Sequence, residues 1–479
     1  MLKIQESDIH LIGLQTRFPA KYGIVSMTGC PHAFVRVRVE IDNRAFTGIA
    51  ADNLPPKWFK KDPDQPIPEE TDEILSVIEN AAKACVGMTG DSAFDVARQI
   101  SAAQSAWGAG EGHPPLLSNF GATLIERAVI EAVCKHANLA FAEALRSNAL
   151  GVNLAAHDDR LAGLAPLDLL PNRPRSTIIA RHTVGLADAL TDADIIPDKR
   201  VDDSLPQSLE ACIRRYGLKH FKIKIGGEVE ADSDRLQRIA DILQREAAPN
   251  YAFTFDGNEC FNAFDAFQDY WSRLLEVTSL APFLQRLIFV EQPFHRDIAL
   301  DASAMRNLPS WRNRPALIID ESGGESDSLT RALKLGYQGF GYKSCKGVFR
   351  GVAGACLLAK LRRENPGSSW LLSGEDLGNV GPISLQQDLA VAAALGIESV
   401  ERNGHHFFAG LSAFPKAAQA QTLQHHSDFY GESEAGWPTV QVSDGEVRLD
   451  SINAAPLGVG FELDVEQFTP AEKWRDSVG

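Results

Sequence analysis

Residues 251–258 read Tyr-Ala-Phe-Thr-Phe-Asp-Gly-Asn, an apolar run of β-forming residues that ends in a carboxylate and a turn. The same pattern returns at 287–293, where Glu-Gln-Pro follows the run, and at 316–324, where Asp-Glu-Ser-Gly-Gly follows it. A carboxylate at the end of a buried strand is costly to desolvate unless a cation pairs with it. The repeated pattern therefore predicts three strand ends that meet around shared positive charge.

The three acids belong to a longer series with a nearly constant pitch. Neighbouring members lie 26 to 35 residues apart, and the series is Lys224, Asp256, Glu291, Asp320 and Lys346. A strand with its return helix takes roughly 30 residues. The series therefore predicts an α/β fold, a (β/α)₈ TIM barrel, with these side chains at the mouth where barrel chemistry lies.

Alternating apolar and helical patterns extend the prediction to a complete barrel. The expected strands are 177–184, 219–225, 251–256, 287–291, 316–320, 338–343, 369–373 and 398–402. The expected helices are 204–217, 229–247, 262–279, 298–308, 326–336, 350–364 and 382–395. Eight strands are the number that closes such a barrel.

The regions on either side of the barrel have other patterns. The period of two in Phe34–Ile41 indicates a half-buried strand, with partners near 9–16 and 47–50, and residues 70–163 are helical in pattern. In the tail, 439–442 and 446–449 flank Asp-Gly, which predicts a hairpin. We expect an α+β domain at 1–165, the barrel at 166–403 and a returning tail at 404–479.

Composition narrows the class of function. The chain has 479 residues, of which 44% are hydrophobic, and 63 acids against 47 bases give a net charge of −16. Such a charge disfavours nucleic acid and anionic membranes, and suits a small-molecule substrate. We expect no signal peptide or transmembrane helix. Seven scattered cysteines with no CxxC pair favour reduced thiols in a cytoplasm.

The charged residues suggest a metal site with two bases. Asp256, Glu291 and Asp320 offer the oxygen ligands that Mg²⁺ prefers, although each acid could instead cap a helix. Strand alternation places Lys222 and Lys224 together on the inner face. At the sixth strand, we expect Lys346 to serve the chemistry and Lys343 to pack or form a salt bridge. The histidine pair 405–406 is expected to face solvent.

Together these motifs resemble the enolase superfamily, most closely its muconate lactonizing enzyme subgroup within the mandelate racemase/muconate lactonizing enzyme family. The matching elements are Lys-Ile-Lys at 222–224, Asp-Gly-Asn at 256–258, Glu-Gln-Pro at 291–293, Asp-Glu-Ser at 320–322, the lysine at 346 and the tail segment 457–464. The match covers roughly 175–402 well, and the regions on either side in outline.

The resemblance implies a modified barrel capped by the α+β domain, with the C-terminal tail joining that cap. It implies Mg²⁺ on the three acids, and a substrate carboxylate that loses its α-proton to form an enediolate. Lys224 and Lys346 would be the acid/base pair, and Lys222 would stabilise the anion by donating a hydrogen bond to it. Racemisation or epimerisation, cycloisomerisation and dehydration all remain open. A homo-oligomer is a family expectation.

Departures from the family leave the substrate open. Ser-Gly-Glu-Asp at 373–376 stands where relatives with a histidine base would carry that histidine. The candidates for substrate contact are Asn258, Glu321, Glu375 and Asp376. The loops expected to set specificity are 22–32 and 50–59. Two alternatives also remain: a Schiff-base lyase that uses a barrel lysine such as Lys224, and an inactive metal-binding homologue.

Overall fold

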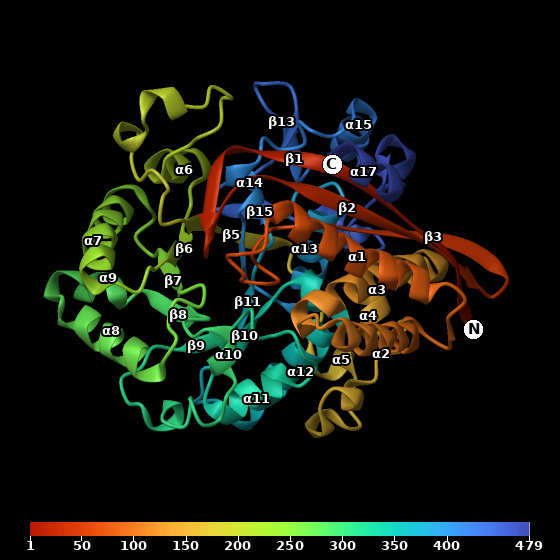
Figure 1. Ribbon diagram of the computed structural model, residues 1–479, viewed down its shortest axis with the longest axis horizontal. Helices are drawn as coiled ribbons and strands as arrows, with labels where there is room; N and C mark the ends of the chain where they lie inside the picture. The colour runs from red at the N-terminus through yellow and green to blue at the C-terminus, as the bar shows by residue number, and fades with distance from the viewer. Residues whose placement is uncertain (479) are drawn as a thin grey trace.

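The N-terminal part of the chain is an antiparallel sheet with helices on it. In the computed structural model, which describes residues 1–478 and the side chains of 1–475, three long strands form a meander (Figure 1). They are β1 (Leu2–Tyr22), β2 (Val25–Ile41) and β3 (Arg44–Asn53). Asp42 and Asn43 both take positive φ, 50° and 61°, which suits the two-residue turn between β2 and β3. The predicted strand at 34–41 and its two partners are confirmed, with longer bounds.

Helices cover one face of this sheet. They are α1 (Ile67–Cys85), α2 (Ala93–Glu111), α3 (Pro115–Ala137) and α4 (Phe141–Arg146), with the short strand β4 (Thr89–Gly90) between the first two. Helix α3 is buried along most of its length because it packs on β2 and β3 and also reaches the barrel. At Gly48 a Cβ atom would lie 1.8 Å from the Ala128 carbonyl oxygen, so only glycine permits this contact.

Eight parallel strands close into a barrel, which confirms the predicted fold. They are β5 (Thr177–Val184), β6 (His220–Lys224), β7 (Ala252–Asp256), β8 (Leu287–Glu291), β9 (Leu317–Ile319), β10 (Gly339–Tyr342), β11 (Leu371–Gly374) and β12 (Ser399–Glu401). Each pairs with the next, and β12 pairs with β5 to complete the ring. Every predicted strand is present within a few residues of its expected bounds.

The barrel helices match the expectation with one exception. They are α5 (Pro166–Leu169), α6 (Leu209–Tyr216), α7 (Val229–Glu246), α8 (Phe264–Glu276), α9 (Ala281–Leu284), α10 (Arg296–Ala299), α11 (Ser328–Leu335), α12 (Val348–Glu364) and α13 (Ser384–Leu395). The predicted helix 298–308 is wrong, since the chain turns after α10. The Asp301 carboxylate accepts a bond from the Ala304 amide at 2.7 Å, and Pro309 disfavours helical backbone before it.

The tail adds elements to both parts of the molecule. They are α14 (Gly404–Phe407), α15 (Lys416–His425), β13 (Tyr430–Glu432), β14 (Pro438–Val440), β15 (Glu446–Arg448), α16 (Asp450–Ala454), β16 (Thr469–Pro470) and α17 (Ala471–Val478). Strand β16 pairs with β1, so the chain returns to the N-terminal sheet. The boundaries at 165 and 403 stay predictions.

The predicted tail hairpin is only partly present. Asp444 and Gly445 form the turn with φ of 50° and 71°, and Ser443 pairs with Glu446. Beyond that pair the two arms separate, because β14 pairs with β13 and β15 pairs with β5 of the barrel. An isolated two-stranded hairpin is marginal in water, whereas β15 buries Val447 completely against the barrel.

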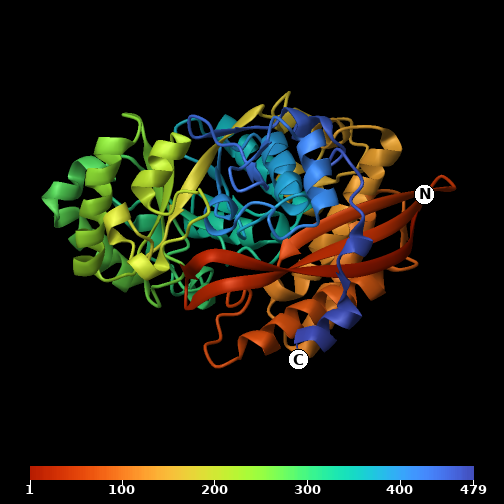
Figure 2. The same cartoon turned by 90° about the horizontal axis from the view of Figure 1, so that it is seen from above.

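The far ends of β1 and β2 extend over the barrel. Figure 2 shows these strands running from the N-terminal domain toward the first barrel strand, and Thr16 forms a bridge with Phe408 beyond β12. No helix within the described residues is long and apolar enough to cross a membrane.

Candidate active site at the barrel mouth

Neighbouring strands bring the predicted charged residues to one level. Lys224 on β6 pairs in register with Asp256 on β7, and Asp256 pairs with Glu291 on β8. Asp320 directly follows β9, and Lys343 directly follows β10. Side chains on adjacent parallel strands therefore gather at the carboxyl ends, as the pitch of the sequence predicted.

Lys222 lies at the centre of this gathering. Its Nζ atom is 3.0 Å from Asp256, 2.8 Å from Glu291, 2.9 Å from Glu375 and 3.0 Å from Glu401. Burial by itself lowers the pKa of Lys222, but the surrounding carboxylates raise that pKa well above its ordinary value. Lys222 is therefore a buried ammonium that neutralises several carboxylates at once.

Two members of this network, Glu401 and Arg181, were missed by the sequence analysis. Glu401 ends β12 and accepts a hydrogen bond from Thr183 at 2.7 Å. Arg181, on β5, is buried and lies 2.5 Å from Glu375. The pattern of an apolar strand ending in an acid, which identified Asp256, is also present at Val400-Glu401 and could have found that residue.

The four candidates for substrate contact divide into two pairs. A pocket lies at the barrel mouth and is lined by Lys222, Lys224, Asp256, Asp320 and Lys343; it is called the main pocket below. Asn258 and Asp376 also line it. Glu375 does not, because its carboxylate is held by Lys222 and Arg181 below that pocket. Glu321 is also buried. Its pKa is raised to about 7, mainly by burial and to a smaller extent by the negative charge of Asp320.

Lys224 stands on one side of the pocket. Its Nζ atom lies 2.5 Å from Asp256 Oδ2 and 2.6 Å from Asn258 Oδ1. Asn258 takes a positive φ of 40°, just after the strand end, so its side-chain amide turns back toward the lysine. Lys224 is thus held in place by both a charge and a neutral acceptor.

Lys343 forms the expected salt bridge and also lines the main pocket. Its ammonium contacts Asp320 at 2.7 Å and lies 4.5 Å from the centre of the Trp58 ring. Lys346 does not line this pocket, because its Nζ binds the carbonyl oxygens of Asp320 and Gly341 at 3.0 and 2.7 Å. The catalytic role expected for Lys346 stays a prediction.

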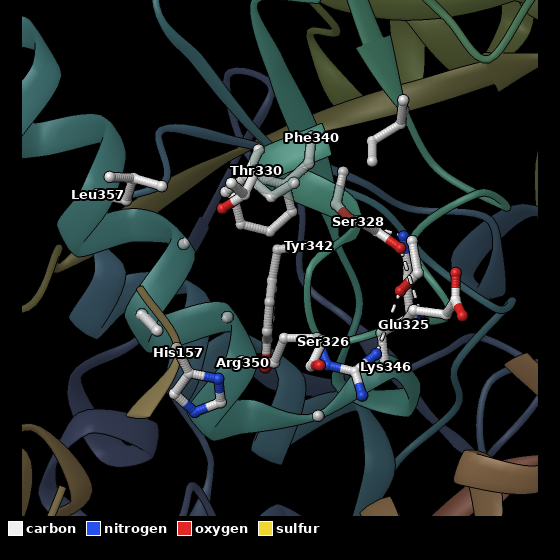
Figure 3. Close-up of a pocket in the computed structure, with 18 of the residues that line it drawn as sticks. His157, Glu325, Ser326, Ser328, Thr330, Phe340, Tyr342, Lys346, Arg350 and Leu357 are labelled. Atoms are coloured by element: carbon white, nitrogen blue, oxygen red, sulfur yellow. Dashed lines mark hydrogen bonds between the residues drawn. The ribbon is translucent and has the colours of Figure 1, made fainter. Parts of the chain in front are cut away.

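Lys346 faces a second cavity on the outer side of the strands. This cavity of about 50 Å³ lies between β10 and helices α11 and α12, and Figure 3 shows Lys346 there with Glu325 and Arg350. From this outer side, Lys346 fixes the position of Asp320, because its Nζ atom donates to both Oδ1 and the carbonyl oxygen of Asp320.

The main pocket has a charged floor and an apolar cover. It encloses about 80 Å³, and Lys222, Lys224, Asp256, Asp320 and Lys343 all line it. The apolar residues around it are Ala20, Tyr22, Met27, Pro55, Trp58, Leu377, Phe407 and Phe408. Both segments expected to set specificity, 22–32 and 50–59, contribute to this cover. The first of these segments is largely strand β2 rather than the expected loop.

The donor set matches a hard divalent cation in kind, but in the described residues oxygen atoms of the three predicted acids do not all lie within 4.8 Å of one another. Asp256, Glu291 and Asp320 are buried, come from consecutive strands, and present oxygen atoms of the kind Mg²⁺ prefers. Burial and the nearby Glu375 raise the pKa of Glu291 well above its ordinary value, and Glu291 Oε2 makes no directed hydrogen bond. A divalent ion would relieve this crowding of carboxylates, which Lys222 and the neighbouring cations relieve in the structure.

Comparisons with known proteins support the fold. A mandelate racemase/muconate lactonizing protein from Herpetosiphon aurantiacus is similar over 96% of this chain and 99% of its own, with TM-score 0.60 and 16% identity. A muconate lactonizing enzyme from Pseudomonas fluorescens, solved with muconolactone, is similar over 97% and 98%, with TM-score 0.58 and 17% identity. An enolase from alpha pretobacterium bal199, solved with bound magnesium, is similar over 98% of each chain, with TM-score 0.58 and 13% identity.

These likenesses confirm the fold resemblance that the motifs indicated. No protein-family model and no curated protein matches the chain. At sequence identities of 16, 17 and 13%, the three structures show that this chain shares their fold. The chemistry of this chain depends on its own residues.

Proposed function

We propose that this chain is a Mg²⁺-dependent enzyme that removes the proton α to a substrate carboxylate. Epimerisation, cycloisomerisation and elimination of water could each follow from that step. The observation that carries the proposal is that Lys224 and Lys343 line one pocket with Asp256 and Asp320 between them. A proton next to a carboxylate is very weakly acidic, so its removal requires both a base and stabilisation of the anion.

The acids Asp256, Glu291 and Asp320 would hold the metal. When bound, Mg²⁺ would act as a Lewis acid on the substrate carboxylate and offset the charge that grows as the proton leaves. Lys222 adds to this effect, because its protonated Nζ lines the same pocket and can donate a hydrogen bond to an anion there.

Two lysines give the pocket two possible proton acceptors. Burial lowers the pKa of Lys343, whereas the charge of Asp320 raises it, and the second effect prevails in the structure. If the Asp320 carboxylate moved away from Lys343, burial would become the main influence on the pKa of that lysine. The pKa would then fall, which favours the neutral amine that can act as a base. Lys224 forms the corresponding ion pair with Asp256, at 2.5 Å from Oδ2. We therefore assign proton transfer to Lys224 and Lys343, and a positioning role to Lys346.

The cover of the pocket favours a substrate with an apolar group. Trp58, Phe407 and Phe408 are each less than 10% exposed and face the pocket with Leu377 and Met27. Among the described residues no arginine lines this pocket, so it offers no guanidinium for a bidentate contact with a second carboxylate or a phosphate, and Lys21 is the one lining cation besides Lys222, Lys224 and Lys343. We propose a monocarboxylate with an aromatic or aliphatic substituent in preference to an acid sugar.

Hydrogen exchange at the α-carbon tests the proposal directly. The full chain would be incubated with Mg²⁺ in deuterated water, together with panels of aryl and aliphatic carboxylates, dipeptides and acid sugars. Deuterium uptake that requires Mg²⁺, and that is lost from one face of the α-carbon in Lys224→Met and from the other face in Lys343→Met, would support it. Exchange that persists on both faces in both variants would contradict it. Substrate-dependent trapping of a lysine by borohydride without metal would instead favour the Schiff-base lyase.

A further inference from the structure

A second cluster of metal-ligating side chains lies behind one wall of the pocket. It consists of His182 on β5, Cys212 on α6 and His406 on α14, and all three side chains are buried. One ligand atom from each lies within 4.8 Å of the other two, and no other such group occurs in the described part of the chain. The expectation that the histidine pair 405–406 faces solvent is therefore wrong for His406, which is 3% exposed.

Distances within the cluster are those of metal ligands. Cys212 Sγ lies 3.6 Å from Nδ1 of His406. A tetrahedral zinc ion would separate a nitrogen ligand from a sulfur ligand by about 3.6 Å. This pair therefore already has the spacing of one edge of such a tetrahedron. His405 lies beside the cluster, with its Nε2 atom 3.3 Å from Nδ1 of His182, but it is outside the group of three.

The chemical state of the cluster also suits a metal. Burial lowers the pKa of His182 to about 4 and that of His406 well below its ordinary value, so both rings are neutral near pH 7. A neutral imidazole is the form that binds metal. No carboxylate forms an ion pair with His182, His405 or His406 in the described residues, so their lone pairs are not engaged by acids.

Hydrogen bonding within the cluster is an incomplete alternative. The Cys212 thiol can donate to His406, and His182 can share a hydrogen bond with His405. That arrangement depends on a thiol donor, which is weak, so it satisfies the buried imidazole of His406 poorly.

We propose that His182, Cys212 and His406 bind one transition-metal ion of the zinc class. The Cys212 thiol would lose its proton to solvent as Sγ binds the ion. Imidazole and thiolate ligands favour zinc over magnesium, so this site differs in chemistry from the carboxylate site.

The position of the ion would be structural. It would connect β5, α6 and α14, which adjoin in Figure 1, and α14 leads directly into Phe407 and Phe408 of the pocket wall. Arg17 of β1 donates to the His406 carbonyl oxygen at 2.7 Å, and the Phe18 ring packs edge-on against the His406 ring. Metal binding would therefore fix the wall where the N-terminal sheet meets the barrel.

Cobalt binding tests this site separately from the proposed reaction. The full chain, stripped with chelator, would be titrated with Co²⁺ in excess Mg²⁺, which occupies sites with oxygen ligands. We expect one equivalent of Co²⁺ to bind with a thiolate-to-cobalt charge-transfer band, which oxygen ligands cannot produce. Cys212→Ser should lose the band, and the matched control Cys134→Ser, buried within α3, should retain it.

Absence of the band in the natural chain would overturn the proposal, as would its persistence in Cys212→Ser. If Cys212→Ser does not fold, X-ray absorption of the zinc-loaded natural chain decides the question. One sulfur and two or three nitrogen ligands would support the site, and a shell of oxygen atoms would exclude it. Either result is independent of whether the barrel mouth exchanges α-protons.

Discussion

Lys343 and Lys346 hold opposite oxygens of one carboxylate, Asp320, at 2.7 and 2.6 Å. Only Lys343 lines the main pocket, and Lys346 lies behind the strand end in the outer cavity. The short 3₁₀ turn Ser344–Lys346 carries the chain away from the barrel axis, so two lysines three residues apart serve different sides of the same acid.

This relationship predicts unequal effects for the two lysines. Lys343→Met should lower α-proton exchange from one face of the substrate by about 10²–10⁴-fold, which is the usual contribution of a general base. Lys346→Met should lower exchange by a smaller factor than Lys343→Met does. The factor should be the same for both faces, because Lys346 acts through Asp320. Lys360→Met, on the exposed side of α12, is the control. Equal, face-specific losses in both variants would contradict the assignment.

Lys222 should be essential to stability when no metal is present. Lys222→Met leaves a group of buried carboxylates without its ammonium, and breaking a buried ion pair costs about 3–5 kcal/mol. Chemical denaturation of the chelator-treated protein would measure this loss. Lys219→Met, which removes a partly exposed pair with Glu446, should cost less than about 1 kcal/mol.

Magnesium should partly restore the Lys222→Met variant. A divalent ion among the same carboxylates supplies the missing positive charge, and a ligand that binds only the folded state stabilises it. The rise in melting temperature on adding Mg²⁺ should be larger in Lys222→Met than in the natural chain. No rise in either protein would argue against a metal site at the barrel mouth.

The apolar cover should control recognition of the substrate. Phe408→Ala removes a buried ring from the pocket wall, and burial of such a side chain contributes roughly 1.5–3 kcal/mol. We expect kcat/KM for an aryl carboxylate to fall by about tenfold or more, with a much smaller change for a compact carboxylate. Leu275→Ala, on the exposed side of α8, should change neither value.

Stability should fall in mild acid because of a buried histidine in the N-terminal sheet. Burial lowers the pKa of His32 to about 4, while the unfolded chain keeps the ordinary histidine pKa of 6.5. The unfolded state therefore binds the proton first, and stability is lost as the pH falls from 6.5 towards 4. A shift of this size corresponds to about 3 kcal/mol. His32→Gln should show a shallower loss in denaturation curves across this range, and an identical slope would contradict the assignment.

The barrel and most of its charged mouth could be predicted from local sequence patterns. The strand pattern, its pitch and the acids at the strand ends are local features, and parallel pairing carries them to one edge whatever the loops do. Asp256, Glu291 and Lys222 are therefore brought together as predicted.

Tertiary structure decided what depends on direction and packing. Whether Lys343 or Lys346 meets the pocket depends on one turn after β10, and the choice between a tail hairpin and a barrel strand depends on where Val447 can be buried. The cluster of His182, Cys212 and His406 joins residues from three distant elements, so no local pattern marks it. Local periodicity fixes which face of a strand a side chain takes, whereas contacts between distant segments fix its neighbours.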